Sequence, residues 1–310
     1  MNPTQAIKIL IICGPTASGK SELALRLARD LGAEIINADS MQIYRGLDIG
    51  TAKPSAEQQA EICHHLIDTV DPDQSFSAAG FSTAADAAIR NISNRGKRII
   101  VAGGTGLYIR ALVNGLVDSP GGTDELREAL HGEAARVGNE AMLEQLRLVD
   151  PELAAGLHPN NLVRVIRALE VYRQTGVPLS RYQKEHAFAT SRYNTLQVGV
   201  SVDRARLYMR IEDRVERMLA AGLMEEVNGL LAAGYGADLK PLRSIGYKEA
   251  VAYLCGKISY EEAIRLIKRN TRHYAKRQLT WFKANPDILW FEYPENFGTI
   301  KKHAIDFFEQ

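Results

Sequence analysis

The sequence predicts an α/β protein built on a P-loop: a mostly parallel, doubly wound sheet flanked by helices, with an all-helical insertion domain. Three observations lead to this fold class. An apolar run at 7–13 precedes a glycine-bounded loop and an amphipathic segment. Two further apolar runs, at 34–38 and 97–102, alternate with helical patterns. About seventy residues from position 115 onward show helical periodicity and no strand pattern.

The glycine-bounded loop matches the G-x-x-x-x-G-K-S pattern in the strand–loop–helix context that this motif requires. Its backbone N–H groups and the following helix N-terminus favour phosphate oxygens. Lys20 adds a point charge, and Ser21 offers a hydroxyl suited to a phosphate-bound Mg²⁺. We therefore expect a di- or triphosphate to be bound by Gly14, Pro15, Thr16, Ala17, Ser18, Gly19, Lys20 and Ser21.

Composition indicates an ordinary soluble globular protein, with 45% hydrophobic residues, 24% charged residues and a formal net charge of +1. The three cysteines are scattered without C-x-x-C spacing, which argues against a disulfide framework and a zinc site. No apolar run approaches the ~20 residues of a membrane span, and too few residues precede the first strand for a signal peptide. These features predict a cytoplasmic protein with no membrane partner.

The second strand, at 34–38, ends at Asp39-Ser40-Met41-Gln42. Ligands of open α/β sheets bind at the carboxyl edge of the strands, so Asp39 is expected beside the phosphate-binding loop. A helix at about 82–94 leads to the strand at 97–102, which runs into Gly103-Gly104-Thr105-Gly106. This run lacks the third glycine of a dinucleotide fingerprint, and we interpret it as a tight turn that places Thr105 at the same edge as Asp39.

The pattern changes near position 115. A linker at 118–123 precedes helices at about 124–137 and 139–149, and a third helix starts at 160 or 161 and stops at Gly176. Strand patterns return at 196–202 and 288–291, with helices from 204 to 283 between them. The predicted domains are therefore an α/β core at 1–114 plus 196–310 and a helical insertion at 115–195.

Positive charge is concentrated in two segments of this nearly neutral chain. Between Lys240 and Lys283, eleven Lys and Arg residues stand against three Glu, and between His158 and Arg192 six stand against two. Such segments suggest a polyanionic partner, because phosphate contacts dominate nucleic-acid affinity. The alternative is a solvated, charged helix face.

The residues alone leave the chemistry open between two interpretations. P-loop proteins that transfer a γ-phosphate normally place a second acid at a strand end, but the strand at 97–102 ends in two glycines. Asp39 is the one convincing candidate. It could hold Mg²⁺ or a substrate hydroxyl, as in a small-molecule kinase, or it could act as a general base toward a diphosphate-bearing carbon.

Eight motifs, in order along nearly the whole chain, resemble those of the tRNA isopentenyltransferase family, as found in bacterial tRNA dimethylallyltransferases. They lie at 14–21, 37–44, 48–54, 64–68, 103–108, 164–170, 243–247 and 276–282. The resemblance implies transfer of a dimethylallyl group from dimethylallyl diphosphate to the exocyclic amine of the adenosine 3′-adjacent to the tRNA anticodon, releasing diphosphate. The P-loop would then cradle the donor diphosphate with Mg²⁺ on Ser21, and the absence of a second acid fits this chemistry.

The same resemblance implies roles for individual residues. Asp39 accepts the amine proton, and Thr105 hydrogen-bonds the amine or orients Asp39. Arg210 or Arg214 reaches the diphosphate, and the sequence does not distinguish them. Gln42 has an amide suited to adenine. Because the target base must leave its stack to reach the donor, the site should be a channel entered from two sides.

The resemblance also implies a tRNA surface that grips the anticodon stem-loop. Its expected residues are Asp39, Ser40, Met41, Gln42, Thr105, Arg127, Val163, Arg164, Val165, Ile166, Arg167, Arg243, Ser244, Ile245, Gly246, Tyr247 and Lys248. We expect a monomer. His64 and His65 are interpreted as structural, and Trp281 and Phe282 as core residues. Two alternatives remain: transfer to free adenine nucleotides, as in adenylate isopentenyltransferases, and a P-loop kinase or NTPase.

Overall fold

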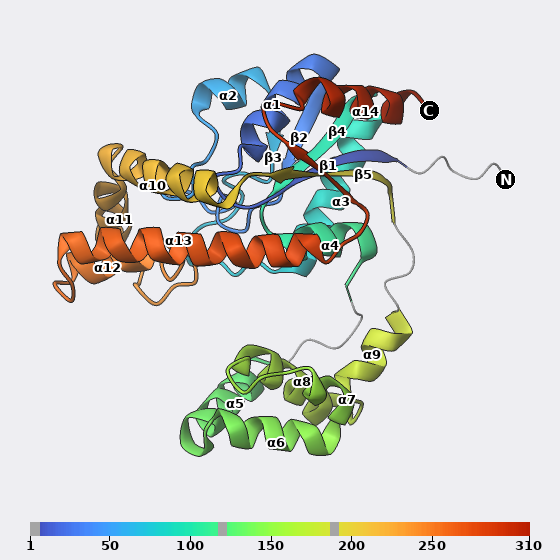
Figure 1. Cartoon of the computed structure of the whole chain (residues 1–310). Coiled ribbons are helices and arrows are strands. Elements are labelled where there is room, and N and C mark those ends of the chain that lie inside the picture. Colours follow the sequence, from blue (N-terminus) through green and yellow to red (C-terminus); the bar gives the residue numbers. More distant parts are fainter. Residues whose placement is uncertain (1–6, 117–122, 187–191) are drawn as a thin grey trace. The chain divides into compact units, whose positions relative to one another are not determined.

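The structure, a computed structural model, describes residues 7–116, 123–186 and 192–310 (Figure 1). The chain divides into two compact units, a core unit of 1–113 with 192–310 and a helical unit of 114–191. The insertion predicted from the sequence, 115–195, ends too late. Asn194 and Thr195 pair with Lys8 and Ile9 in the sheet and therefore belong to the core unit. The predicted linker at 118–123 lies outside the described residues except for Thr123.

The core unit is built on a six-stranded sheet in the order β3-β2-β4-β1-β5-β6. All of its strand pairs are parallel, which confirms the predicted fold class. The strands are β1 Lys8–Cys13, β2 Ala33–Asn37, β3 His64–His65, β4 Arg98–Gly103, β5 Asn194–Ser201 and β6 Ile288–Glu292. Most of their predicted bounds differ from the observed ones by one or two residues.

Helices cover both faces of this sheet because alternate side chains of its strands point to opposite sides. Ile9, Ile11 and Cys13 of β1 join the cluster packed by α3 (Ala78–Asn94) and α4 (Gly106–Asn114). Leu10 and Ile12 join the opposite cluster, packed by α1 (Lys20–Leu31) and α14 (Phe297–Glu309). Every one of these five β1 side chains is fully buried, so the strand has the continuous apolar character of a central parallel strand.

A third apolar cluster joins the loop after β2 to the C-terminal helices. Ile43, Tyr44 and Leu47 of the loop pack with residues of four helices and of the segment before α12. These helices are α10 Arg204–Ala220, α11 Leu223–Ala232, α12 Tyr247–Leu254 and α13 Tyr260–Lys283; the short α2 spans Ala56–Glu61. In Figure 1, α10 and α13 run as long neighbouring helices. This cluster places α10, α12 and α13 around the carboxyl edge of the strands.

The helical unit has its own core and defined helix ends. Its elements are α5 Asp124–Val137, α6 Asn139–Val149, α7 Pro151–Ala155, α8 Leu162–Thr175 and α9 Leu179–His186. Leu130, Met142, Leu146 and Leu169 are buried in one cluster. Asp150 caps α7 through Leu153 N–H (3.1 Å) and also accepts from Ser180 N–H (2.9 Å). The predicted helices at 124–137 and 139–149 match; α7 and α9 were not predicted, being too short for clear periodicity.

No helix in the described part of the chain combines the length and apolar character needed to cross a membrane.

The carboxyl ends of β2 and β4 approach so closely that one residue between them must be glycine. A Cβ placed on Gly103 would lie 2.2 Å from the carbonyl oxygen of Ala38 and 2.3 Å from its carbonyl carbon. Ala38 N–H donates to Ala102 O (2.8 Å) and Thr105 N–H donates to Ala38 O (3.1 Å). Asp39 and Thr105 are therefore held at one edge of the sheet by backbone contact.

We expect Gly103→Ala to lower the free energy of unfolding by about 1–3 kcal/mol, because the added methyl group collides with backbone that cannot rotate away. Urea unfolding would measure the loss. Gly229→Ala in α11 is the matched control, since a Cβ there meets nothing within 4 Å. That variant should gain up to about 1 kcal/mol from helix propensity. Equal stability of the two variants would contradict the close approach at Gly103.

Candidate active site

The loop between β1 and α1 has the backbone of a phosphate cradle. Gly14 and Gly19 have φ of 149° and 97°, in the left-handed region that glycine tolerates. Gly19 precedes α1 and supplies no side-chain cap, so the first-turn amides of the helix remain for a ligand. Ser18 N–H closes the loop on Pro15 O at 3.3 Å. The arrangement favours an anion at this helix N-terminus.

Lys20 brings a buried cation to this cradle. It is 9% exposed, and its Nζ donates to Pro15 O at 3.3 Å. Burial lowers the pKa of Lys20 to about 8, with a further lowering by Arg214 and an opposing effect of Asp39. Among the described residues no carboxylate accepts a hydrogen bond from this ammonium group, which suits it to a phosphate group.

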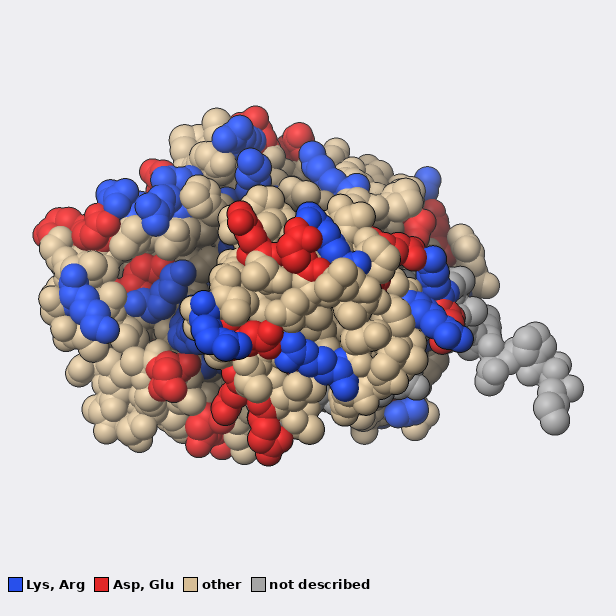
Figure 2. All heavy atoms as spheres, turned by 90° about the horizontal axis from the view of Figure 1, so that it is seen from below, with Lys and Arg blue, Asp and Glu red and all other residues tan. Residues whose placement is uncertain are grey.

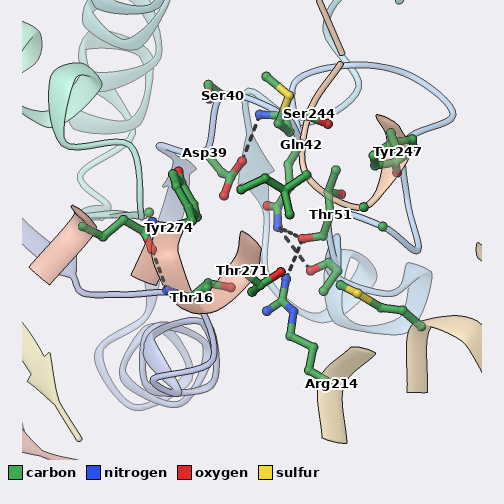
Figure 3. A pocket seen from close by; sticks show the side chains of 18 of the residues that line it. Thr16, Asp39, Ser40, Gln42, Thr51, Arg214, Ser244, Tyr247, Thr271 and Tyr274 are labelled. Atoms are coloured by element: carbon green, nitrogen blue, oxygen red, sulfur yellow. Dashed lines mark hydrogen bonds between the residues drawn. The ribbon is translucent and has the colours of Figure 1, made fainter. Parts of the chain in front are cut away.

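A central cavity of about 340 Å³ opens in front of the cradle (Figure 3). Five parts of the chain wall it: the P-loop and start of α1, the end of β2 with the segment after it, the loop 50–52, the end of β4, and the C-terminal helices with the segment before α12. Its polar side chains come from Thr16, Lys20, Ser21, Asn37, Asp39, Ser40, Gln42, Thr51, Arg214, Arg243, Ser244, Tyr247, Thr271, Tyr274, Arg277 and Gln278.

A second cavity, of about 420 Å³, adjoins the same cradle and shares Lys20, Ser21 and Arg214 with the central one. Arg210 and Arg217 line it as well. The two arginines that the sequence could not distinguish both reach the region: Arg210 donates to Ser18 O and Arg214 to Thr51 O, each at 3.1 Å. Burial lowers the pKa of Arg214 and Asp39 opposes this. Such a cluster of cations suits a diphosphate.

Asp39 stands in the central cavity on a turn that the neighbouring strand supports. Its Oδ1 accepts from Met41 N–H at 2.9 Å, and its own N–H donates to Asn37 Oδ1 at 3.2 Å. Thr105 holds the same turn, since its Oγ1 accepts from Ser40 N–H at 3.0 Å. Thr105 is not among the residues that line the cavity. Its observed contacts thus position the turn that carries Asp39.

Gln42 was expected to pair with adenine through both ends of its amide. In the structure its Nε2 donates to Thr51 O (3.1 Å) and Ala52 O (3.2 Å), and the residue is 8% exposed. Figure 3 shows this amide pointing to the loop 50–52 rather than into open space. A bidentate pairing with a base would break these bonds. That expectation is therefore corrected: both hydrogens of the amide nitrogen are donated to backbone carbonyls of the loop.

Sequence reasoning missed the contribution of α13. Thr271, Tyr274 and Gln278 line the central cavity at helical spacing. Gln278 joins two loops: its Oε1 accepts from Thr16 N–H and its Nε2 donates to Gly104 O, both at 2.8 Å. Burial raises the pKa of Tyr274, which keeps its hydroxyl protonated. The signal that could have found them was the spacing of polar residues along one face of a long helix.

Residues 243–247, which end at the first residue of α12, line the central cavity. Their predicted contact with tRNA stays a prediction. Ser244 Oγ donates to Pro241 O (2.6 Å), and Gly246 N–H donates to Glu249 Oε2 (2.8 Å). Tyr247 is 1% exposed and donates its hydroxyl to Glu226 Oε1 (2.5 Å). Lys248 is not among the lining residues and lies 3.6 Å from Glu249.

The expected tRNA residues of the helical unit fall into two groups. Val165 and Ile166 are 0% and 3% exposed and pack in the core of the unit, so tRNA contact by their side chains is ruled out and that prediction is wrong. Val163 is 77% exposed and Arg164 is also exposed. Helical periodicity explains the difference, because Val165 and Ile166 lie on the face of α8 that packs into the core of the unit.

Arg127 and Arg167 converge on a buried carboxylate. Glu170 is fully buried and lies 2.9 Å from Arg127 and 2.6 Å from Arg167 in ion pairs. The side chains of these arginines are still 45% and 34% exposed. Glu170 thus fixes two cations at the surface of the unit and removes one unit of their charge.

The basic segment at 240–283 is also partly neutralised. Lys268 pairs with Glu216 (2.5 Å) and Arg272 pairs with Glu212 (2.7 Å), both on α10, and Arg265 pairs with Glu262 (2.6 Å). Figure 2 shows basic and acidic side chains interspersed over the face in view. The local charge excess counted along the sequence therefore overstates the excess on the folded surface.

Two other interpretations meet the structure differently. Phe282 is 3% exposed and in the core, as expected, but Trp281 is 38% exposed and was wrongly placed there.

Glu34, Cys63 and His65 bring ligand atoms within 4.8 Å of one another. Arg95 binds both oxygens of Glu34 and, with His65, holds the pKa of that carboxyl at about 2. An ion-pair network accounts for this cluster.

Comparison with known proteins gives one consistent result. The family model described as IPP transferase matches residues 42–285. A tRNA dimethylallyltransferase 1 of Pelobacter propionicus is 64% identical over 97% of this chain and 98% of its own, and a tRNA dimethylallyltransferase of Geobacter sulfurreducens is 56% identical over 97% of each.

Solved structures agree. The tRNA isopentenylpyrophosphate transferase of Bacillus halodurans is similar with a TM-score of 0.72 and 39% identity, covering 97% of both chains. A eukaryotic dimethylallyltransferase acting on tRNA is similar with a TM-score of 0.81 and 31% identity, covering 97% of this chain and 78% of that one.

We expect the affinity for inorganic diphosphate to fall as the pH rises through about 8, by about tenfold per pH unit, because the Lys20 ammonium loses its proton there. Calorimetric titration between pH 6.5 and 9.5 would measure it. Lys20→Arg is the control: a guanidinium stays charged, so any remaining pH dependence belongs to the diphosphate itself. Identical pH profiles for the two proteins would contradict the lowered pKa of Lys20.

Proposed function

This chain belongs to the IPP transferase family, and from that membership we propose that it is a tRNA dimethylallyltransferase. It transfers a dimethylallyl group from dimethylallyl diphosphate to the exocyclic amine of the adenosine 3′-adjacent to the anticodon and releases diphosphate. We further propose that a monomer suffices, because one core unit supplies all the lining residues of both cavities.

One observation carries the proposal: Lys20 of the P-loop and Arg214 of α10 stand where two cavities meet. Lys20, Ser21 and Arg214 line both, whereas Asp39 lines the central cavity and Arg210 the second. Dimethylallyl diphosphate bound through its diphosphate to the P-loop would then present its allylic carbon toward Asp39. A nucleophile entering the central cavity could reach that carbon from the side opposite the leaving group.

The reaction requires one bond to form and one to break. The amine nitrogen of adenosine attacks the allylic carbon, and the carbon–oxygen bond breaks with its electron pair passing to the diphosphate. Lys20, Arg214 and the loop amides stabilise the charge that develops on this leaving group. Asp39 accepts the proton that the amine loses. Its Oδ1 is oriented by Met41 N–H, which leaves the other oxygen for the substrate.

Mg²⁺ fits the donor set when it is shared with a diphosphate. Ser21 offers an exposed hydroxyl in the lining of both cavities. Mg²⁺ prefers oxygen ligands and retains waters, so one hydroxyl plus phosphate oxygens is a suitable set. When bound, the ion would neutralise part of the charge of the leaving group. Ser21 would hold it.

The tRNA substrate is favoured over the two alternatives by particular features. The strand end next to the P-loop, Gly103–Gly104, offers no second acid for phosphoryl transfer. A free nucleotide would use the central cavity but would leave the helical unit without a role. Arg164 is exposed there, and Glu170 holds Arg127 and Arg167 at the surface. These three arginines fit the phosphates of an anticodon stem-loop.

Labelled dimethylallyl diphosphate, offered with tRNA, with AMP and with neither, tests the function. We expect label in tRNA alone, on the adenosine after the anticodon as located by mass spectrometry of nuclease fragments. In the same assay Asp39→Asn should lower turnover by about a hundredfold or more while diphosphate binding persists, because the amide keeps an acceptor for Met41 N–H but takes up no proton. Label in AMP, or ATP hydrolysis without transfer, would instead support an alternative.

We expect Arg164→Ala to weaken tRNA binding and to lower the slope of log affinity against log salt by about 0.7 to 0.9, the loss of one phosphate contact. Filter binding between 50 and 300 mM salt would measure the slope. Arg147→Ala is the control, since Arg147 is paired with Glu144 on the surface of the same unit. An unchanged slope for Arg164→Ala would show that this arginine makes no phosphate contact and is only part of a solvated, charged helix face.

A further inference from the structure

Glu226 of α11 holds the loop after β2 by an unusual set of contacts. Its Oε2 accepts from the N–H groups of Asp48 (2.9 Å) and Ile49 (2.7 Å). Its Oε1 accepts from Gly50 N–H (3.1 Å) and from the hydroxyl of Tyr247 (2.5 Å). Three successive backbone amides thus converge on one carboxylate, in the manner of an anion nest. All four lone-pair sites of the carboxylate are used.

The next two residues of this loop orient both halves of the candidate active site. Thr51 O accepts from Arg214, which with Lys20 lines both cavities. Thr51 O and Ala52 O together accept from Nε2 of Gln42, which lines the central cavity beside Asp39. The loop is therefore the common support of a residue on the diphosphate side and a residue on the base side.

The contact between loop and helix is also close-packed. A Cβ on Gly50 would lie 2.5 Å from the ring of Tyr247, so the loop backbone lies directly against that ring. Burial, and then the charge of Glu226, raise the pKa of Tyr247, which keeps its hydroxyl a donor to the carboxylate. Glu226 itself lines neither the central cavity nor the second one.

We propose that Glu226 is a positioning residue for prenyl transfer, which sets the places of Arg214 and Gln42 through the backbone of residues 48–52. The inference rests on the proposed function. It assigns Glu226 no contact with either substrate. Its carboxylate determines where the loop carbonyls lie, and these carbonyls determine the orientation of the guanidinium and amide groups that face the reactants.

Glu226→Gln tests this role. An amide can accept at its oxygen alone, so at least one backbone N–H of the loop, or the Tyr247 hydroxyl, loses its acceptor. We expect the KM for dimethylallyl diphosphate to rise about tenfold and kcat to fall by a similar factor, because the loss of a hydrogen bond to a charged group costs free energy of this size. Amide hydrogen exchange of residues 48–52 should become about tenfold faster. Glu225→Gln, at the exposed neighbouring acid, should stay within twofold of the wild type in each measurement.

A double-mutant cycle separates positioning from general loosening of the fold. If Glu226 acts through Arg214, then Glu226→Gln should cost much less in the Arg214→Ala background than in the wild type. Additive effects would overturn the proposal, as would Glu226→Gln with the kinetics and exchange of Glu225→Gln. Failure of the proposed function would be recognised separately, because the wild-type protein would then transfer no dimethylallyl group. In that case, faster amide exchange in Glu226→Gln would still support the contact between Glu226 and the loop.

Discussion

The buried ammonium group of Lys20 is the constraint on which the candidate site depends. A cation placed beside Arg214 with little access to water is unfavourable in the free protein, and the lowered pKa of Lys20 is the measure of that cost. The fold maintains it because strand packing fixes β1 and the helix α1 begins at this residue. A bound diphosphate would remove the repulsion between the two cations. The site is therefore complementary to a highly charged anion before any ligand arrives.

Backbone contact, more than side-chain packing, holds the remaining reactive groups at the same edge. The absence of a Cβ at Gly103 lets β4 meet Ala38, and this brings Thr105 to the turn of Asp39. Gln278 of α13 joins the P-loop to Gly104 through hydrogen bonds with Thr16 N–H and Gly104 O. Because the P-loop and the turns after β2 and β4 are bonded to one another or to α13, displacement of one would disturb the others. Such mutual support keeps reacting groups within the tolerance that catalysis requires.

Local patterns in the sequence predicted the parallel sheet, the P-loop, and the meeting of Asp39 with it, because strand alternation and the loop motif are set by neighbouring residues. The long-range partners were not predictable. Gln42 donates its amide hydrogens to Thr51 O and Ala52 O, and the acids of α10 pair with α13 residues that lie 52 and 60 positions away along the chain. Helical periodicity alone could have predicted that Val165 and Ile166 are buried, but the family motif at 164–170 led to their assignment as tRNA contacts.

Contacts at both ends hold the loop after β2 in place, so residues 50–52 form a fixed wall of the central cavity. Lys53, whose side chain is 3% exposed, donates to Tyr44 O (3.0 Å) and pairs with Asp68 (2.5 Å) and Asp48. Glu226 holds the preceding three amides. A loop bonded at both ends has little conformational entropy left to lose when substrates bind. Binding energy from tRNA is then available for drawing the target base out of its stack, which is the costly step for an enzyme that modifies a base inside a loop of RNA.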